Sequence, residues 1–270
     1  MTTITIAAYN RPEYLRTVLQ SLLVALAASG EFGRNAKIVI GIDRSHFGSG
    51  DRGLEVQAVA LQFAAVAGRL GHLEPEVIVW PEHLGVSEHP RRLLQYVFTE
   101  LRSQFNTHLE DDTVLSPDAL NLAAWYQRSV TYASGHVDKV VCMSLHSRST
   151  DYSNPAIIRF RPDFGVWGWC CSYISWWLWF SHYWNSKRTG MLGYDWSASY
   201  MLHKHGLWTL EPALSRVRNI GREHGVHQTP EGHDLEMAGL VWAGQEHVHQ
   251  VEEFVLDPAK PARPEWVWGD

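Results

Sequence analysis

Strand-like runs alternate with helical patterns over the first 115 residues of this 270-residue chain, and no other feature limits its fold as strongly. Three stretches between the runs repeat apolar residues at the spacing of an amphipathic helix. Strands that alternate with helices need crossover connections, which build a mainly parallel sheet. The sequence therefore predicts an α/β fold with a Rossmann-like, mainly parallel sheet flanked by helices. The predicted strands are Thr3–Ala8, Lys37–Asp43, Glu76–Trp80 and Phe105–Leu109, and the predicted helices run to about Ala28, over Leu54–Ala67 and over Gly85–Phe105.

Two of the predicted helices carry capping signals at their start. Asn10 stands before Pro12, and Glu13 is placed to complete a capping box. Ser116 stands before Pro117, an order that favours an N-cap followed by a first helical turn. We therefore expect Asn10 and Ser116 to cap helices.

The second half of the chain has a different pattern. Strands are predicted at Lys139–Leu145 and Ala156–Phe160, and a helix from Asp195 to about His205. The stretch Phe164–Trp184 is dense in aromatic residues. Aromatic side chains of this kind suit core packing and also stacking on sugar rings or bases. For most residues of this stretch the core is the favoured interpretation, and one or two tryptophans are kept as candidates for stacking on a ligand.

Domain organisation follows from what the sequence lacks. The chain shows no internal repeat and no linker-like segment. We therefore expect a single domain over residues 1–270. Within it, residues 1–115 are expected to bind one ligand and residues 116–256 to face a second substrate. Residues 257–270 form a proline-rich tail.

Charge and composition exclude several classes of protein. The net charge is −6 and the isoelectric point is near 6.2, which argues against a basic nucleic-acid-binding face. No apolar run is long enough to span a bilayer, and the first strand begins too near Met1 for a signal peptide. Cys142, Cys170 and Cys171 do not make a disulfide framework. A cytoplasmic protein without a membrane anchor is expected.

The tripeptide Glu110-Asp111-Asp112 is the strongest chemical signal, because it ends a short buried strand. Adjacent carboxylates repel one another, so in a buried setting they favour a compensating cation. Carboxylate oxygens suit Mg²⁺ or Mn²⁺, which usually also binds a substrate diphosphate. Asn10, Arg11 and Asp43 also follow predicted strands, and ligands of parallel sheets lie at this edge. A solvated acidic turn is the alternative interpretation.

Other motifs are weaker. Residues 48–53 match the dinucleotide-binding pattern GxGxxG, but they are separated from the second strand, so we interpret them as a flexible loop. Close histidine pairs lack the further ligands that zinc needs. His224 and His227 are kept as candidates for the metal or ligand site because they follow Arg222 in a loop flanked by glycines. Asp195 stands between Tyr194 and Trp196 as either an N-cap or a general base.

These pieces, in this order, resemble the GT-A nucleotide-sugar glycosyltransferases, and most of all the N-acetylglucosaminyltransferase I family (glycosyltransferase family 13). The stretches that carry the resemblance in the first half are Ala8-Tyr9-Asn10-Arg11, Ile42-Asp43, His89–Leu94 and Glu110-Asp111-Asp112. The resemblance implies that Asn10 and Arg11 contact the nucleotide, with Arg11 at the diphosphate. It implies that Asp43 binds the uridine, that His89 approaches the uracil, and that Asp112 binds Mn²⁺ (or Mg²⁺). Glu110 and Asp111 then orient the metal's waters or the sugar hydroxyls.

The second half carries further matches. Gly165–Trp169 resembles a stretch near the donor sugar, which implies a role for Trp169. Tyr194-Asp195-Trp196 resembles the segment with the catalytic base, which implies Asp195. Leu214-Ser215-Arg216 with Gly221-Arg222 and Gly225 resembles a loop that orders over bound donor, which implies Arg222.

The chain also departs from the family. The family has two acids before the tryptophan where this chain has only Asp195, and the loop after Arg222 carries an extra residue. The family's animal members are membrane-anchored proteins with disulfides, and this sequence suggests neither feature. The acceptor of those members, a mannose-rich N-glycan core, is therefore not carried over.

The resemblance implies an inverting, metal-dependent glycosyltransferase that moves a sugar, GlcNAc or glucose, from a UDP-sugar to an acceptor hydroxyl. The expected acceptor is a glycan or a glycoside, and a modified base of phage DNA is the alternative. Two other classes remain open. A non-catalytic carbohydrate-binding protein would use the tryptophans but gives no reason for the acidic triplet, and a nucleotidyltransferase would have a glycine-rich first loop in place of Tyr9-Asn10-Arg11-Pro12.

Overall fold

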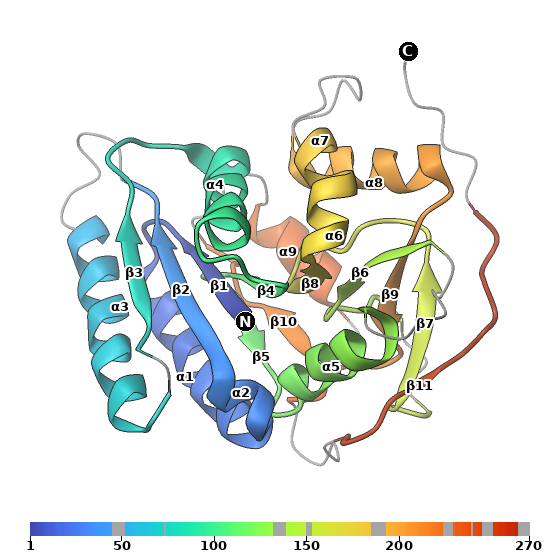
Figure 1. The fold of residues 1–270 in the computed structure, drawn as a ribbon, viewed down its shortest axis with the longest axis horizontal. Helices are drawn as coiled ribbons and strands as arrows, with labels where there is room; N and C mark the ends of the chain where they lie inside the picture. The colour runs from blue at the N-terminus through green and yellow to red at the C-terminus, as the bar shows by residue number, and fades with distance from the viewer. Residues whose placement is uncertain are drawn as a thin grey trace.

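The computed structural model of the chain describes residues 1–44, 52–72, 74–131, 139–149, 153–184, 193–223, 229–238, 240–244 and 251–263. Within these ranges the strands form one sheet of nine, in the order β11-β7-β9-β6-β8-β4-β1-β2-β3, and a separate pair, β10-β5 (Figure 1). Helices cover both faces of the large sheet. The predicted α/β class is confirmed.

The first half supplies the parallel part of the sheet. Its strands are β1 (Thr2–Ala8), β2 (Ala36–Ile42), β3 (Glu76–Val79) and β4 (Phe105–Glu110). Strands β3, β2, β1 and β4 are neighbours and run parallel. Ala8 pairs with Ile42, and Ala7 pairs with Glu110, so three strands end side by side. The alternation of strands and helices predicted this part because parallel neighbours require crossovers.

The second half makes the sheet mixed. Its strands are β6 (Val140–Ser144), β7 (Ile157–Arg161), β8 (Trp169–Ser172), β9 (Trp208–Pro212) and β11 (Val255–Leu256). Strand β8 runs antiparallel to both β4 and β6, and so joins the two halves of the chain in one sheet. The small pair consists of β5 (Thr113–Leu115) and β10 (Val217–Asn219).

Two groups of helices pack on opposite faces of the sheet (Figure 1). One face carries α1 (Pro12–Ala28), α2 (Glu31–Asn35), α3 (Arg52–Arg69) and α5 (Ala119–Tyr126), which a π-helical turn, η1 (Gln127–Thr131), extends. The other carries α4 (Gly85–Thr99), α6 (Tyr173–Ser175), the π-helical η2 (Trp176–Phe180), α7 (Ser181–Tyr183) and α8 (Tyr194–His205). Helix α9 (Pro230–Met237) follows β10 along the chain. Among the described residues, no helix combines the length and apolar character needed to cross a bilayer.

The aromatic stretch of the second half is core only in part, because Tyr173 and Trp177 are 37% and 38% exposed. Trp169, Trp176, Phe180 and Trp184 are each at most 2% exposed. The indole of Trp169 lies 5.0 Å from the Phe180 ring and 6.2 Å from the Trp184 ring, measured between centroids. These rings fill the space between the sheet, α4 and α8, where large flat side chains bury much apolar surface.

Three predicted helix boundaries were wrong. Helix α1 begins at Pro12 with Arg11 at the N-cap position, so Asn10 does not cap it. Ser116 does not cap α5, because the residues after the acidic triplet first form β5 and the helix begins at Ala119. Helix α4 ends at Thr99, and the chain then turns through Arg102, whose φ of 53° no helix continues.

Candidate active site

The candidate site lies where β1, β2 and β4 end. The loop after β1 carries Arg11, Asp43 follows β2, and the acidic triplet begins with the last residue of β4. The backbone N–H of Asp43 donates to Ala8 O at 2.8 Å, and the N–H of Asp111 donates to Ala7 O at 3.0 Å. The pairing of the strands therefore continues into the functional loops and fixes their relative positions.

Arg11 bridges two carboxylates of the triplet. Its Nη1 lies 2.8 Å from Asp112 Oδ2, and its Nη2 donates to Asp111 Oδ1. The other oxygen of Asp111 accepts the backbone N–H of Tyr9 at 3.1 Å. Burial alone would lower the pKa of the Arg11 guanidinium, but the charges of Asp111 and Asp112 raise it above its usual value. Both oxygens of Asp111 are thus engaged in holding the loop after β1.

Asp112 keeps one oxygen unsatisfied. Its side chain is 7% exposed, and among the described residues Oδ1 has no hydrogen-bond partner. Its main-chain oxygen accepts the N–H of Ile220 at 2.8 Å, which brings the segment after β10 against the triplet. A Cβ on Gly221 would lie 2.2 Å from Asp112 Oδ2, so only glycine permits this approach. A buried carboxylate oxygen without a partner is costly unless a cation or donor fills the gap.

Glu110 has a different environment from the two aspartates. Its Oε1 accepts a hydrogen bond from the hydroxyl of Tyr194 at 3.0 Å. Burial and the nearby charge of Asp112 raise the pKa of Glu110 to about 8, against the opposing effect of the Tyr194 hydroxyl. This contact places the start of α8, which Tyr194 begins, next to the triplet.

The charges around the triplet favour a divalent cation. Two aspartates face one guanidinium, that of Arg11, and the raised pKa of Glu110 shows that the negative charge of the triplet is not fully compensated. Within the described ranges, no three His, Cys, Asp or Glu side chains lie close enough to enclose a metal by themselves. The residues present therefore fit a metal that is held through Asp112 and completes its coordination with water and substrate oxygens.

Asp43 lies at the predicted edge, but its oxygens are already bonded within the protein. Oδ1 accepts the N–H of Leu84 at 2.7 Å, and Oδ2 accepts the N–H of Gly85 at 2.8 Å. His83 Nδ1 lies 3.1 Å from Oδ2, and the His83 ring lies 5.1 Å from the ring of Tyr9. Asp43 thus satisfies the first N–H groups of α4, and His83 and Tyr9 form an aromatic pair between the ends of β1 and β2.

His89 and Trp169 are buried. His89 is 4% exposed. Its Nε2 lies 3.0 Å from the position that a Cβ on Gly41 would occupy. Burial lowers the pKa of His89 to about 4, despite the nearby charge of Asp43, so its imidazole is neutral. Trp169 has no exposed surface and packs edge-on to His108. In this structure a ligand reaches neither ring unless neighbouring groups move.

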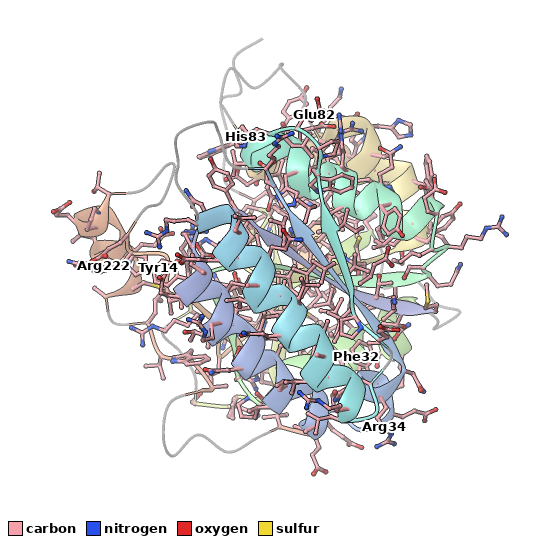
Figure 2. The ribbon with its side chains drawn as sticks, turned by 90° about the vertical axis from the view of Figure 1, so that its left-hand side faces the viewer. Tyr14, Phe32, Arg34, Glu82, His83 and Arg222 are labelled. Carbon is pink, nitrogen blue, oxygen red and sulfur yellow. The ribbon has the colours of Figure 1, made fainter. Side chains whose placement is uncertain are left out.

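The remaining predicted residues lie around this centre. Asn10 is partly exposed in the loop after β1, and Asp195 is partly exposed in the first turn of α8. The guanidinium of Arg222 pairs with Asp234 of α9, with its Nε 2.9 Å from Asp234 Oδ1. Figure 2 shows Arg222 close to Tyr14 of α1 and well apart from His83. His224, His227 and residues 48–51 of the glycine-rich pattern lie outside the described residues.

Sequence reasoning missed three residues that shape the site, namely Tyr9, Tyr194 and Gly221. Tyr9 and Gly221 act through backbone position, so side-chain chemistry gave no signal for them. Tyr194 was visible only as the neighbour of Asp195. Its contact with Glu110 joins residues 84 positions apart, which no local pattern encodes.

The fold partly resembles known protein structures whose sequence identity to this chain is low. No protein-family model and no curated protein sequence matches the chain. The solved structures that it resembles include the mannosyltransferase PcManGT from Pyrobaculum calidifontis in complex with GDP-Man and Mn²⁺ (13% identity, TM-score 0.47), S. aureus TarS 1–349 (12%, 0.43) and the galactosyltransferase LgtC in complex with donor and acceptor sugar analogs (13%, 0.44).

The alignments cover most of this chain but less of the other proteins. They include 77%, 79% and 77% of this chain, and 53%, 58% and 73% of the mannosyltransferase, TarS and LgtC, respectively. The chain thus spans little more than half the length of the first two. The mannosyltransferase and the galactosyltransferase are glycosyltransferases, whereas the resemblance of this chain to the N-acetylglucosaminyltransferase I family stays a prediction from the sequence.

Proposed function

We propose that this chain is an inverting, metal-dependent glycosyltransferase that moves GlcNAc or glucose from a UDP-sugar to an acceptor hydroxyl. The observation that carries the proposal is the buried Oδ1 of Asp112, which has no hydrogen-bond partner among the described residues and stands beside Arg11 at the carboxyl edge of the sheet. A carboxylate oxygen in this position suits a divalent cation that also binds a diphosphate. An acidic turn in solvent does not fit, because Asp111 and Asp112 are buried.

The three acids of the triplet then have separate roles. Asp112 holds Mn²⁺ or Mg²⁺, and the bound ion supplies Lewis-acid neutralisation of the charge that develops on the departing UDP. Asp111 keeps Arg11 in place, and Arg11 adds positive charge beside the diphosphate. Glu110, whose Oε1 is held by Tyr194, presents its second oxygen for a hydrogen bond with a hydroxyl of the donor sugar.

Asp195 acts as the general base in this proposal. It lies in the first turn of α8, directly after the residue that contacts Glu110. Its carboxylate takes the proton of the acceptor hydroxyl as that oxygen attacks the anomeric carbon. The bond from that carbon to UDP breaks on the opposite side, so one displacement inverts the configuration and no protein nucleophile is needed. In this proposal Asn10, Asp43 and His89 serve the nucleoside side of the same edge, and a nucleoside reaches the buried His89 only when neighbouring groups move.

The test is calorimetric titration of UDP, UDP-GlcNAc and UDP-glucose in Mn²⁺ and then in EDTA. We expect one UDP-sugar to bind only with the metal. Asp112→Asn should weaken that binding by about 100-fold, or roughly 2.7 kcal/mol, because it removes the charge that holds the ion. Asp195→Asn should bind the donor as wild type does and lose most of its turnover, measured as release of UDP.

Three outcomes would contradict the proposal. Metal-independent sugar binding without any affinity for UDP would favour a carbohydrate-binding protein. Full affinity of Asp112→Asn in Mn²⁺ would remove this residue from the metal site, and release of pyrophosphate in place of UDP would indicate a nucleotidyltransferase.

A further inference from the structure

Tyr194 is held rigidly by the aromatic core. Its ring is 3% exposed and stacks on the indole of Trp184, with centroids 4.4 Å apart and planes 6° from parallel. Phe164 meets the Tyr194 ring edge-on at 6.3 Å. A ring enclosed in this way cannot rotate without displacing its neighbours, so the position of its hydroxyl is fixed.

The same stack is anchored to the helix that flanks the candidate site. Nε1 of Trp184, which is 2% exposed, donates to the main-chain oxygen of Ser87 in the first turn of α4 at 2.8 Å. Asp43 satisfies the first N–H groups of that helix. The stacked pair therefore connects the start of α4 with the start of α8.

The hydroxyl of Tyr194 reaches from α8 to the acidic triplet. It donates to Glu110 Oε1 at 3.0 Å, across the interface between β4 and α8. Burial and the negative charge of Glu110 raise the pKa of Tyr194 well above its usual value, so the hydroxyl keeps its proton and remains a donor.

We propose that Tyr194 is a positioning residue of the transfer reaction: its hydroxyl holds the Glu110 carboxylate and so fixes the distance between the acidic triplet and the turn of α8 that carries Asp195. The inference rests on the proposed function, because it concerns the alignment of donor and base. A displacement of the order of 1 Å between reacting groups lowers turnover strongly while leaving binding of the leaving group intact.

Tyr194→Phe tests the inference, since it removes the hydroxyl and keeps the stacked ring. With the UDP-sugar that wild type binds in Mn²⁺, we expect kcat for UDP release to fall about tenfold or more, while the Kd of UDP stays within about twofold. Tyr183→Phe is the matched control. The hydroxyl of Tyr183 lies 2.5 Å from His205 Nε2 at the far end of α8, so its loss should change neither value.

A double-mutant cycle separates positioning from general loss of structure. If Tyr194 acts through Glu110, then Tyr194→Phe should lower kcat no further in a Glu110→Ala background. Equal, additive losses in both backgrounds would overturn the inference, as would wild-type kcat in Tyr194→Phe. A parallel fall of UDP affinity and kcat would also overturn it, because that pattern indicates a damaged fold.

Failure of the inference and failure of the proposed function give different experimental results. The inference alone fails when wild type binds a UDP-sugar and releases UDP but Tyr194→Phe behaves as wild type does. Both fail when wild type binds no uridine nucleotide in Mn²⁺.

Discussion

His146 shows at the scale of one residue how burial links protonation to stability. Its side chain is 4% exposed in the segment after β6, and its ring meets Trp167 edge-on at 4.8 Å. Burial lowers the pKa of His146 to about 3, and the positive charges of Arg161 and Arg148 add to the effect. The folded protein therefore keeps this imidazole neutral at pH values where the unfolded chain, with a histidine pKa of about 6.5, is protonated.

This difference in pKa predicts that the free energy of unfolding decreases at acidic pH. Between pH 7 and pH 5 the unfolded state gains a proton at His146 and the folded state does not, so acidification destabilises the fold through this residue. His146→Gln should remove the contribution. Its free energy of unfolding relative to wild type should therefore rise by about 2 kcal/mol from pH 7 to pH 5. Urea unfolding at both pH values measures the change.

Unfolding of wild type and His146→Gln at higher pH provides the control. Between pH 7 and pH 8 the imidazole is neutral in both states, so the difference between wild type and His146→Gln should stay nearly constant. Parallel stability curves from pH 8 to pH 5 would show that His146 is protonated in the folded protein too.

The acidic triplet shows what the sequence could and could not predict at this scale. Its position at a strand end followed from the apolar run before it, and the structure agrees. The separate environments of its members did not follow, because they depend on Tyr194, Arg11 and Gly221, which lie about 84 to 110 positions away. Neighbours so distant in sequence are brought together only by the complete fold.

Helix α4 provides the prediction at the scale of elements. Its N-cap residue, Leu84, has no side chain able to cap, and Asp43 at the end of β2 accepts the N–H groups of Leu84 and Gly85 instead. Asp43→Ala should therefore destabilise the protein by about 1–2 kcal/mol, as loss of a helix cap does. Guanidinium unfolding of the variant against wild type measures this loss.

Glu253 offers a matched control for Asp43, since it is an exposed acid outside the site. Glu253→Ala should change stability by about 0.5 kcal/mol or less. If Asp43→Ala costs no more than this control, the contacts to the start of α4 contribute nothing measurable, and the role of Asp43 would rest on ligand binding alone.

The same helix explains why the elements were predicted better than their ends. The core of α4 follows from Leu93, Leu94, Val97 and Phe98, which are buried and recur at helical spacing. Its start depends on a carboxylate from another strand. Five strands were missed. Strands β5, β10 and β11 contain only two or three residues, too few to show a period, β8 lies inside the aromatic-rich stretch, and β9 ends in a proline.

At the scale of the molecule, one buried ion pair ties together distant segments. Arg216, just before β10, lies with its Nε 3.0 Å from Oδ2 of Asp118, which precedes α5, and the two side chains are 0% and 1% exposed. Asp118 Oδ2 also accepts the N–H of Val251, and the guanidinium of Arg216 donates to Pro155 O at 2.7 Å. The pair thus joins the first helix of the second half to the strands and the carboxyl-terminal segment.

Arg216→Met should destabilise the whole protein by about 3–5 kcal/mol, because it leaves the Asp118 carboxylate buried without its counter-charge. The double variant Arg216→Met/Asp118→Asn should lose less than the single one, since it removes the uncompensated charge as well. Arg148→Met is the surface control: Arg148 pairs with Glu236 at 3.0 Å but is 62% exposed, so its loss should cost about 1 kcal/mol or less. Guanidinium unfolding of the three variants against wild type gives these values. An Arg216→Met variant as stable as Arg148→Met would show that the segments are held by apolar packing alone, and that the buried pair is dispensable to the fold.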